Sequence, residues 1–141
     1  MSEKLVERLV IRGILVYRFY QNTRQASDAY LKLVDVDIQS HIDAGYTDKP
    51  ILYVLDVSRS GMFSVNYMRQ RVSAMVKEKL FWPESYIAYV TDTPNDLVLV
   101  NLIDALTARE LDHTRKIFRT EELDQAIDWL LSTQQKFGDS L

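Results

Sequence analysis

Short apolar runs and helical stripes alternate along this chain. Residues 51–57 are apolar at nearly every position except Asp56, which predicts a strand that is covered on both faces by helices. Residues 86–91 predict a second strand of this kind, and residues 115–119 alternate like a strand with one exposed face. The pattern therefore predicts an α/β domain built around the strand at residues 51–57.

The amino-terminal residues 7–20 also favour extended structure, because they are rich in β-branched and aromatic side chains. Only Gly13 interrupts them. It fits either a tight turn between two short antiparallel strands or a bulge in one long strand, and the pattern does not distinguish these alternatives.

Four stretches carry apolar residues at helical spacing. The first begins after the capping residue Thr23 and ends near Gly45, the second follows residues 58–61, the third spans residues 97–109, and the last follows Thr120. The third is apolar around more than one stripe, which predicts a contact with another helix or with a second subunit in a homodimer.

Strands that alternate with helices imply right-handed crossovers onto a mostly parallel sheet. The first one or two strands fit an antiparallel arrangement. We therefore expect one domain over residues 1–141, with a core from about residue 7 to 133 and a flexible polar tail from Gln134. Its mixed sheet has about five strands and is accompanied by four helices.

The composition limits the chemistry of this domain. At 141 residues, 47% of them hydrophobic, the chain is long enough to bury a core. It has no cysteine, which excludes disulfides and thiolate chemistry and suits the cytoplasm. With only two histidines, far apart in sequence, a metal site is not expected. The net charge of -3 argues against nucleic acid as a partner. No apolar run approaches the roughly 20 residues that span a bilayer, so no transmembrane segment is expected.

Polar residues follow the central strand at its carboxyl end, where function gathers in open parallel sheets. Asp56 ends this strand, and residues 58–61, Ser-Arg-Ser-Gly, lead toward the second helix. Ser58 and Ser60 are candidate phosphoacceptors, because a phosphate at a helix amino end meets free amides and the Arg59 charge. We favour the simpler explanation that these hydroxyls cap the helix.

Asp92 ends the next predicted strand as Asp56 ends the central one. If these strands are neighbours, the two carboxylates could share a cation or one could act as a base. We favour the alternative that each caps the turn after it, because the chain has no phosphate-binding glycine loop and no nucleophile beside a histidine. No catalytic residue, metal or cofactor is expected, and a phosphate-handling enzyme stays a remote option.

The second predicted helix is the most basic part of the chain. Its charged side chains form an ordinary solvated face or, with two aromatic neighbours, a surface for an acidic protein or an anionic lipid. The residues concerned are Phe63, Tyr67, Arg69, Arg71, Lys77 and Lys79.

Residues 116–130, KIFRTEELDQAIDWL, resemble the SpoIIAA-like branch of the STAS family of anti-sigma-factor antagonists. In that branch the last strand ends in a phenylalanine, and the last helix carries an alanine and a tryptophan-leucine pair. The order of predicted elements over residues 9–131 is similar to the same fold. Residues 60–62, Ser-Gly-Met, resemble the serine-glycine-aliphatic motif that follows the central strand in the family, although Arg59 stands where the motif has an aspartate.

The resemblance implies a non-enzymatic regulatory module. In the family a partner kinase phosphorylates one hydroxyl of this loop, and the dephosphorylated form binds that kinase. A protein partner, such as an anti-sigma factor or a kinase, is therefore expected to dock on the loop and the following helix. The implied contact residues are Arg59, Gly61, Phe63, Tyr67, Arg69 and Arg71.

A second function follows from the same resemblance. SpoIIAA-like domains also resemble the lipid-carrying Sec14 fold. The aliphatic residues 97–106 would then line a cavity for an apolar or lipid ligand.

Overall fold

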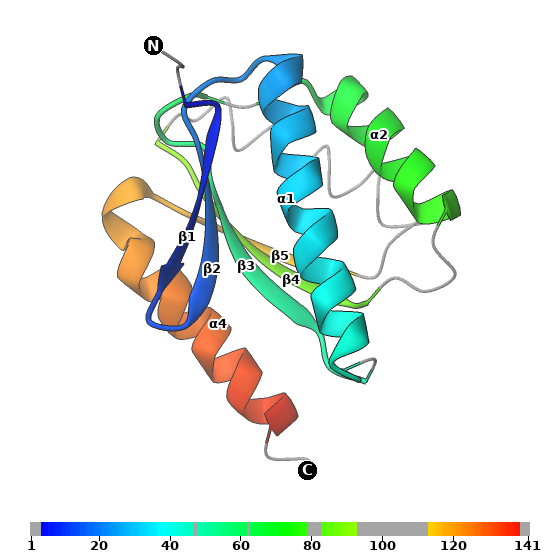
Figure 1. The fold of residues 1–141 in the computed structure, drawn as a ribbon. Coiled ribbons are helices and arrows are strands. Elements are labelled where there is room, and N and C mark those ends of the chain that lie inside the picture. The colour runs from blue at the N-terminus through cyan, green and yellow to red at the C-terminus, as the bar shows by residue number, and fades with distance from the viewer. Residues whose placement is uncertain (1–3, 47, 62, 79–82, 93–112, 139–141) are drawn as a thin grey trace.

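A five-stranded mixed sheet forms the middle layer of the protein, and helices cover both of its faces (Figure 1). The computed structural model describes residues 4–46, 48–61, 63–78, 83–92 and 113–138. The elements in chain order are β1 (Val6–Ile11), β2 (Ile14–Phe19), α1 (Arg24–Asp43), β3 (Ile51–Asp56), α2 (Val65–Glu78), β4 (Ser85–Val90), β5 (His113–Phe118), the short 3-10 helix η1 (Thr120–Glu122) and α4 (Leu123–Gly138).

The interruption at Gly13 is a hairpin turn. β1 and β2 pair antiparallel, with Ile11 opposite Ile14, so only two residues connect the strands. These residues, Arg12 and Gly13, both have positive φ angles, 52° and 83°, as the type I′ turn of a tight hairpin requires. The structure therefore decides between the two alternatives in favour of the hairpin.

The strands follow one another across the sheet in the order β1-β2-β3-β4-β5, and β2 to β5 run parallel. Each step to the next strand goes in the same direction, so right-handed crossovers place their helices on the same face. α1 and α2 accordingly share one face, and α4 covers the other (Figure 1). Sheets of this class usually open a ligand crevice where the strand order reverses. The described strands contain no such reversal.

The two faces of the sheet bury different kinds of core. Alternate residues of each strand point to opposite faces. The face under α1 and α2 is rich in aromatic side chains, among them Tyr17, Phe19, Tyr30, Tyr53, Phe63 and Tyr89. The face under α4 is mainly aliphatic and includes Val16, Val54, Ala88, Val90, Ala126, Ile127 and Leu130.

Buried tyrosine hydroxyls are paired within the aromatic core. The Tyr17 hydroxyl donates to the Asp37 carboxylate, which also accepts two hydrogen bonds of 3.0 Å from Arg8. The Tyr30 and Tyr53 hydroxyls are 2.8 Å apart. Burial, which disfavours a phenolate, raises the pKa of Tyr17, Tyr30 and Tyr53. These pairs tie α1 to β1 and to the middle of the sheet.

The predicted ends of the first helix are confirmed. The Thr23 hydroxyl accepts a hydrogen bond of 3.2 Å from the Ala26 amide, and Gly45 follows the helix with a φ of 84°. The last helix differs from the prediction at both ends. Thr120 is the first residue of η1 rather than its cap, and the Arg119 amide donates to Glu122 instead.

The polar tail that was expected to be flexible from Gln134 is part of α4 as far as Gly138. The ring of Phe137 lies 5.9 Å from that of Tyr86, a contact that gives this last turn a place to pack. The predicted helix at residues 97–109 lies outside the described residues, as do the homodimer contact and the lipid cavity that depend on it. The described residues therefore contain three α-helices, none of them long and apolar enough to cross a membrane.

Candidate docking surface at the carboxyl edge of the sheet

Asp56, at the end of the central strand, is a buried structural carboxylate. One of its oxygens accepts a hydrogen bond of 2.9 Å from Arg18 Nε, and the other accepts from the Ser58 amide at 3.0 Å and the Ser58 hydroxyl at 2.6 Å. Only 5% of its side chain is exposed. Three donors thus satisfy this carboxylate, and it holds the first turn of the loop in place.

The loop after Asp56 makes a tight turn before the second helix begins. The Gly61 amide donates to the Val57 carbonyl over 3.0 Å, and Gly61 has a φ of 75°, which favours glycine. Ser60 donates to the Gly61 carbonyl at 2.7 Å. Both serine hydroxyls are therefore engaged inside the turn.

The second helix begins later than the pattern at Ser60-Gly61 predicted. Its first residue is Val65, and the Tyr67 amide lies 3.4 Å from the Ser64 hydroxyl. Ser64, which was not among the predicted caps, is thus the capping residue. The helix-cap explanation of Ser58 and Ser60 is wrong, and neither serine lies beside the free amides of α2.

Phe63 does not belong to the surface of the protein. It is 3% exposed, and its ring lies 5.5 Å from that of Phe19 in the aromatic core. Burial of this side chain fastens the loop to the sheet. We therefore remove Phe63 from the predicted contact residues.

Arg59, in contrast, is exposed and stacks on an aromatic ring. Its guanidinium carbon lies 5.5 Å from the centre of the Tyr20 ring. The Tyr20 hydroxyl in turn donates to Glu7 at 2.6 Å, and this bond, with a second from Lys4, lowers the pKa of Glu7. The ring beneath Arg59 is therefore fixed in place by β1.

A second stack of this kind joins the beginnings of α1 and α2. The guanidinium carbon of Arg24 lies 5.1 Å from the centre of the Tyr67 ring. The Tyr67 hydroxyl donates to Asp28 at 2.7 Å, and Arg71 Nε lies 3.3 Å from the same carboxylate. Asp28 therefore anchors the tyrosine and one arginine, while Arg24 lies over the ring.

The two stacks lie on the same edge of the molecule. Asn22, just before α1, faces Gly61: a Cβ placed on this glycine would lie 3.9 Å from the Asn22 side-chain nitrogen. The loop of Arg59 thus meets the start of the helix that carries Arg24. We call Tyr20, Arg24, Arg59 and Tyr67 the arginine-tyrosine surface.

Arg69 is exposed but lies on another side of α2. Each helical residue turns the chain by about 100°, which places Arg69 about 160° around the axis from Arg71. Arg71 and Tyr67, one turn apart, share the flank that faces α1. The predicted contact residues therefore divide into two groups, with Arg59, Gly61, Tyr67 and Arg71 at the edge and Arg69 apart from them.

The strands that end near Asp56 and Asp92 are neighbours, as a shared cation site would need. Asp92 is exposed, however, whereas Asp56 is buried and already bonded to Arg18 and Ser58. Within the described ranges no group of three or more histidine, aspartate or glutamate residues could hold a metal ion.

Sequence reasoning missed Tyr20 and Arg24 as parts of this surface, and Asp28 as the carboxylate that holds Tyr67 and Arg71 in place. Arg24 and Asp28 stand four residues apart at the start of a helix, which marks them as neighbours. No sequence signal shows that Tyr67 of another helix lies between them. Comparisons of the chain with protein-family models, curated proteins and solved structures find no match.

Proposed function

We propose that this protein is a non-enzymatic interaction module, similar to STAS and SpoIIAA-like regulators, that docks an acidic segment of a partner protein. The described elements, β1-β2-α1-β3-α2-β4 and then β5-η1-α4, are compatible with the order that this resemblance implies, whose helix at residues 97–109 lies outside the described residues. The docking site is the arginine-tyrosine surface together with Arg71.

The observation that carries the proposal is the pair of exposed arginines whose guanidinium carbons lie 5.1 Å and 5.5 Å from the centres of tyrosine rings. Within the described ranges no carboxylate forms an ion pair with Arg24 or Arg59. A guanidinium that stacks on a ring keeps its N–H groups at the edge, where they can donate to a carboxylate. Arginine and tyrosine are also among the residues most enriched at binding hot spots.

A non-enzymatic role fits the chemistry of Asp56. It is the carboxylate placed where an acid or base would act, but Arg18 and Ser58 already donate to its two oxygens. A group that must take a proton from a substrate needs an oxygen within reach of that substrate. We assign Asp56 to loop support instead.

Affinity capture with matched arginine variants tests the proposal. Arg24→Gln and Arg59→Gln should each reduce recovery of the bound partner about tenfold, since each removes a charged donor at the contact. Recovery from wild type should also fall as salt rises. The thermal midpoint of both variants should stay within about 2 °C of wild type because both side chains are exposed.

Arg69→Gln is the control, since it removes the same exposed group from the other flank of α2. It should leave recovery unchanged. If Arg69→Gln abolishes recovery while the two edge variants do not, docking uses the opposite flank of the helix. If all three variants recover as much partner as wild type does, neither surface is the docking site.

A further inference from the structure

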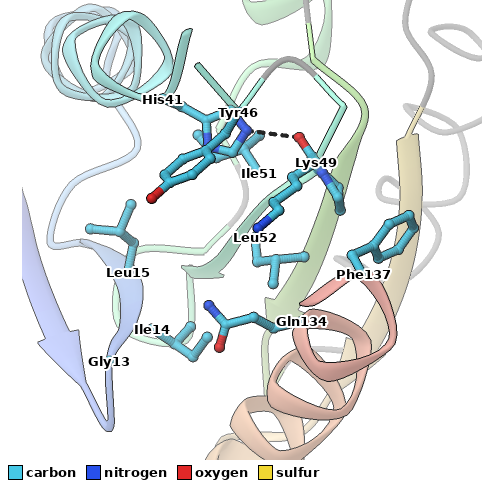
Figure 2. Close-up of a pocket in the computed structure, with 11 residues that line it drawn as sticks. Gly13, Ile14, Leu15, His41, Tyr46, Lys49, Ile51, Leu52, Gln134 and Phe137 are labelled. Carbon is cyan, nitrogen blue, oxygen red and sulfur yellow. Dashed lines mark hydrogen bonds between the residues drawn. The ribbon is translucent and has the colours of Figure 1, made fainter. Parts of the chain in front are cut away.

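A cavity of about 360 Å³ opens at the amino edge of the parallel strands, away from the arginine-tyrosine surface (Figure 2). Four parts of the chain that are distant in sequence meet around it: the β1-β2 hairpin, the end of α1 with the turn after it, the start of β3, and the last turns of α4. Its volume is within the range of roughly 300–1,000 Å³ that is typical of small-molecule sites.

The floor of this cavity is apolar. It is formed at the starts of β2 and β3 by residues from both faces of the sheet, Leu15 and Ile51 on the side of α1 and Ile14 and Leu52 on the side of α4, and Phe137 lies next to them on α4 (Figure 2). A surface of this kind gains free energy when a hydrocarbon or ring replaces water on it. The ligand should therefore have an apolar body.

The Lys49 ammonium brings a positive charge to the lining of the cavity. The His41 ring and the Gln134 amide lie beside it, and none of the described residues that line the cavity is an aspartate or glutamate. Lys49 is partly buried, and within the described ranges no carboxylate forms an ion pair with it. In a chain of net charge -3, this is a locally positive recess that favours an anion.

The lysine is held in position by aromatic neighbours. Its ammonium lies 5.0 Å from the centre of the Tyr46 ring, and the Tyr46 and His41 rings are 5.7 Å apart. His41 Nε2 lies 2.7 Å from the Lys49 carbonyl oxygen, which can only accept, so this nitrogen carries the proton. Figure 2 shows the Lys49 and Gln134 side chains directed into the same space.

We propose that this cavity binds a small hydrophobic carboxylic acid, with its carboxylate between Lys49 and Gln134 and its apolar body on the floor. Lysine supplies the counter-charge and the glutamine amide supplies a second donor. Aromatic and short aliphatic acids share this chemistry. The site is independent of the proposed docking function, because it lies at the opposite edge of the sheet and uses none of the same residues.

Calorimetric titration of the purified chain with matched acids and amides tests this site. Phenylacetate and hexanoate are the probes, and phenylacetamide and hexanamide are their uncharged counterparts. At least one acid should bind about tenfold or more tightly than its amide, since only the acid gains a charge-assisted hydrogen bond. Which acid binds more tightly shows whether the floor selects a ring or a chain.

Two variants locate the binding. Lys49→Met should weaken binding of the acid about tenfold and remove the preference over the amide. Gln134→Trp, at an exposed helix position on the rim, should block both probes while circular dichroism shows an unchanged fold. Lys136→Met removes an exposed lysine of α4 that does not line the cavity, and it should leave binding as in wild type.

Three results would overturn the proposal: equal affinity for acid and amide, acid binding that survives Lys49→Met, or no saturable binding of either acid at millimolar concentration. None of these results bears on the capture experiment with the edge arginines.

Discussion

Arg18 and Asp56 are paired positions of neighbouring parallel strands, and the guanidinium Nε donates to the carboxylate over 2.9 Å. The two side chains are 18% and 5% exposed, so the bond is largely screened from water. A carboxylate this deeply buried depends on its partner, because an unpaired buried charge is costly. This bond is therefore the support on which the loop after β3 depends.

Replacing Arg18 should destabilise the protein strongly. Arg18→Met leaves the buried Asp56 charge without its cation, which should lower the free energy of unfolding by about 2–4 kcal/mol. Urea denaturation followed by circular dichroism measures this change. In the double variant Arg18→Met with Asp56→Asn, the loss should be smaller than the sum of the two single losses.

The control for this prediction is the ion pair between Arg12 and Asp128. Its nitrogen and oxygen are 2.8 Å apart, but the side chains are 47% and 62% exposed. Arg12→Met should therefore cost less than about 1 kcal/mol. Equal losses for Arg12→Met and Arg18→Met would contradict the assignment of Arg18 as a support.

The buried tyrosines should make the protein unfold steeply in alkali. The pKa of Tyr17, Tyr30 and Tyr53 is raised in the folded state, so these side chains keep their protons where the unfolded chain, above about pH 10, loses them. The unfolded state then binds fewer protons, and the free energy of unfolding falls as the pH rises. Each tyrosine contributes a slope that approaches about 1.4 kcal/mol per pH unit well above pH 10 and is about half of that at pH 10.

Denaturation midpoints between pH 9 and pH 11 measure this slope, and Tyr53→Phe should reduce it by the contribution of one tyrosine. Below about pH 9, where tyrosine is neutral in both states, these three residues should contribute no pH dependence. A slope that is the same in Tyr53→Phe and wild type would show that this hydroxyl does not stay protonated.

The two serines of the loop should respond differently to negative charge. A carboxylate at position 58 would lie beside Asp56, where the Ser58 hydroxyl now donates at 2.6 Å. Ser58→Glu should therefore cost about 1–3 kcal/mol of stability through lost hydrogen bonding and charge repulsion. Ser60→Glu loses only a bond to the next carbonyl and should cost less than about 1 kcal/mol. Thermal unfolding of the two variants gives the comparison.

The difference between these variants bears on regulation. If phosphorylation controls docking, Ser60 is the residue that can carry the phosphate without loss of the fold, and mass spectrometry after kinase treatment should find it there. Modification of Ser58 in a protein of unchanged stability would contradict this prediction.

Phe63 and Arg59 lie in the same loop but should behave in opposite ways. Phe63→Ala empties a buried site beside Phe19 and should cost about 3–5 kcal/mol, whereas Phe63→Leu keeps most of the volume and should cost less. Thermal unfolding of both variants checks this order. A weakened pull-down with Phe63→Ala would then report lost folding rather than a lost contact.

Local signals in the sequence predicted the elements well. Strand runs covered on both faces, the Thr23 cap and the Gly45 stop depend on neighbouring residues, and the structure confirms each of them. The start of α2 was misplaced because Ser60 and Ser64 are both acceptable caps. The sequence cannot show that the Ser60 hydroxyl bonds to the Gly61 carbonyl in the turn, so that Ser64 caps the helix instead.

The candidate surface was predicted only in part, because its geometry depends on contacts between distant segments. Arg59 was singled out from its place in the loop, but the ring beneath it comes from Tyr20 at the end of β2. Phe63 has no periodic neighbours, so a loop phenylalanine gives no sign of whether it faces the core. The amino-edge cavity was missed because hairpin, helix ends and strand meet there only after folding.

The strand order sets when each half of the core can form during synthesis. β1 to β4 and the helices on the aromatic face all precede β5, and they can associate as they leave the ribosome. Val16, Val54 and Ala88, on the opposite side, are covered by Ala126, Ile127 and Leu130, which emerge later. Until α4 has been synthesised, the aliphatic face of the nascent sheet is therefore uncovered. Because exposed apolar surface promotes aggregation, protection by chaperones matters most in that interval.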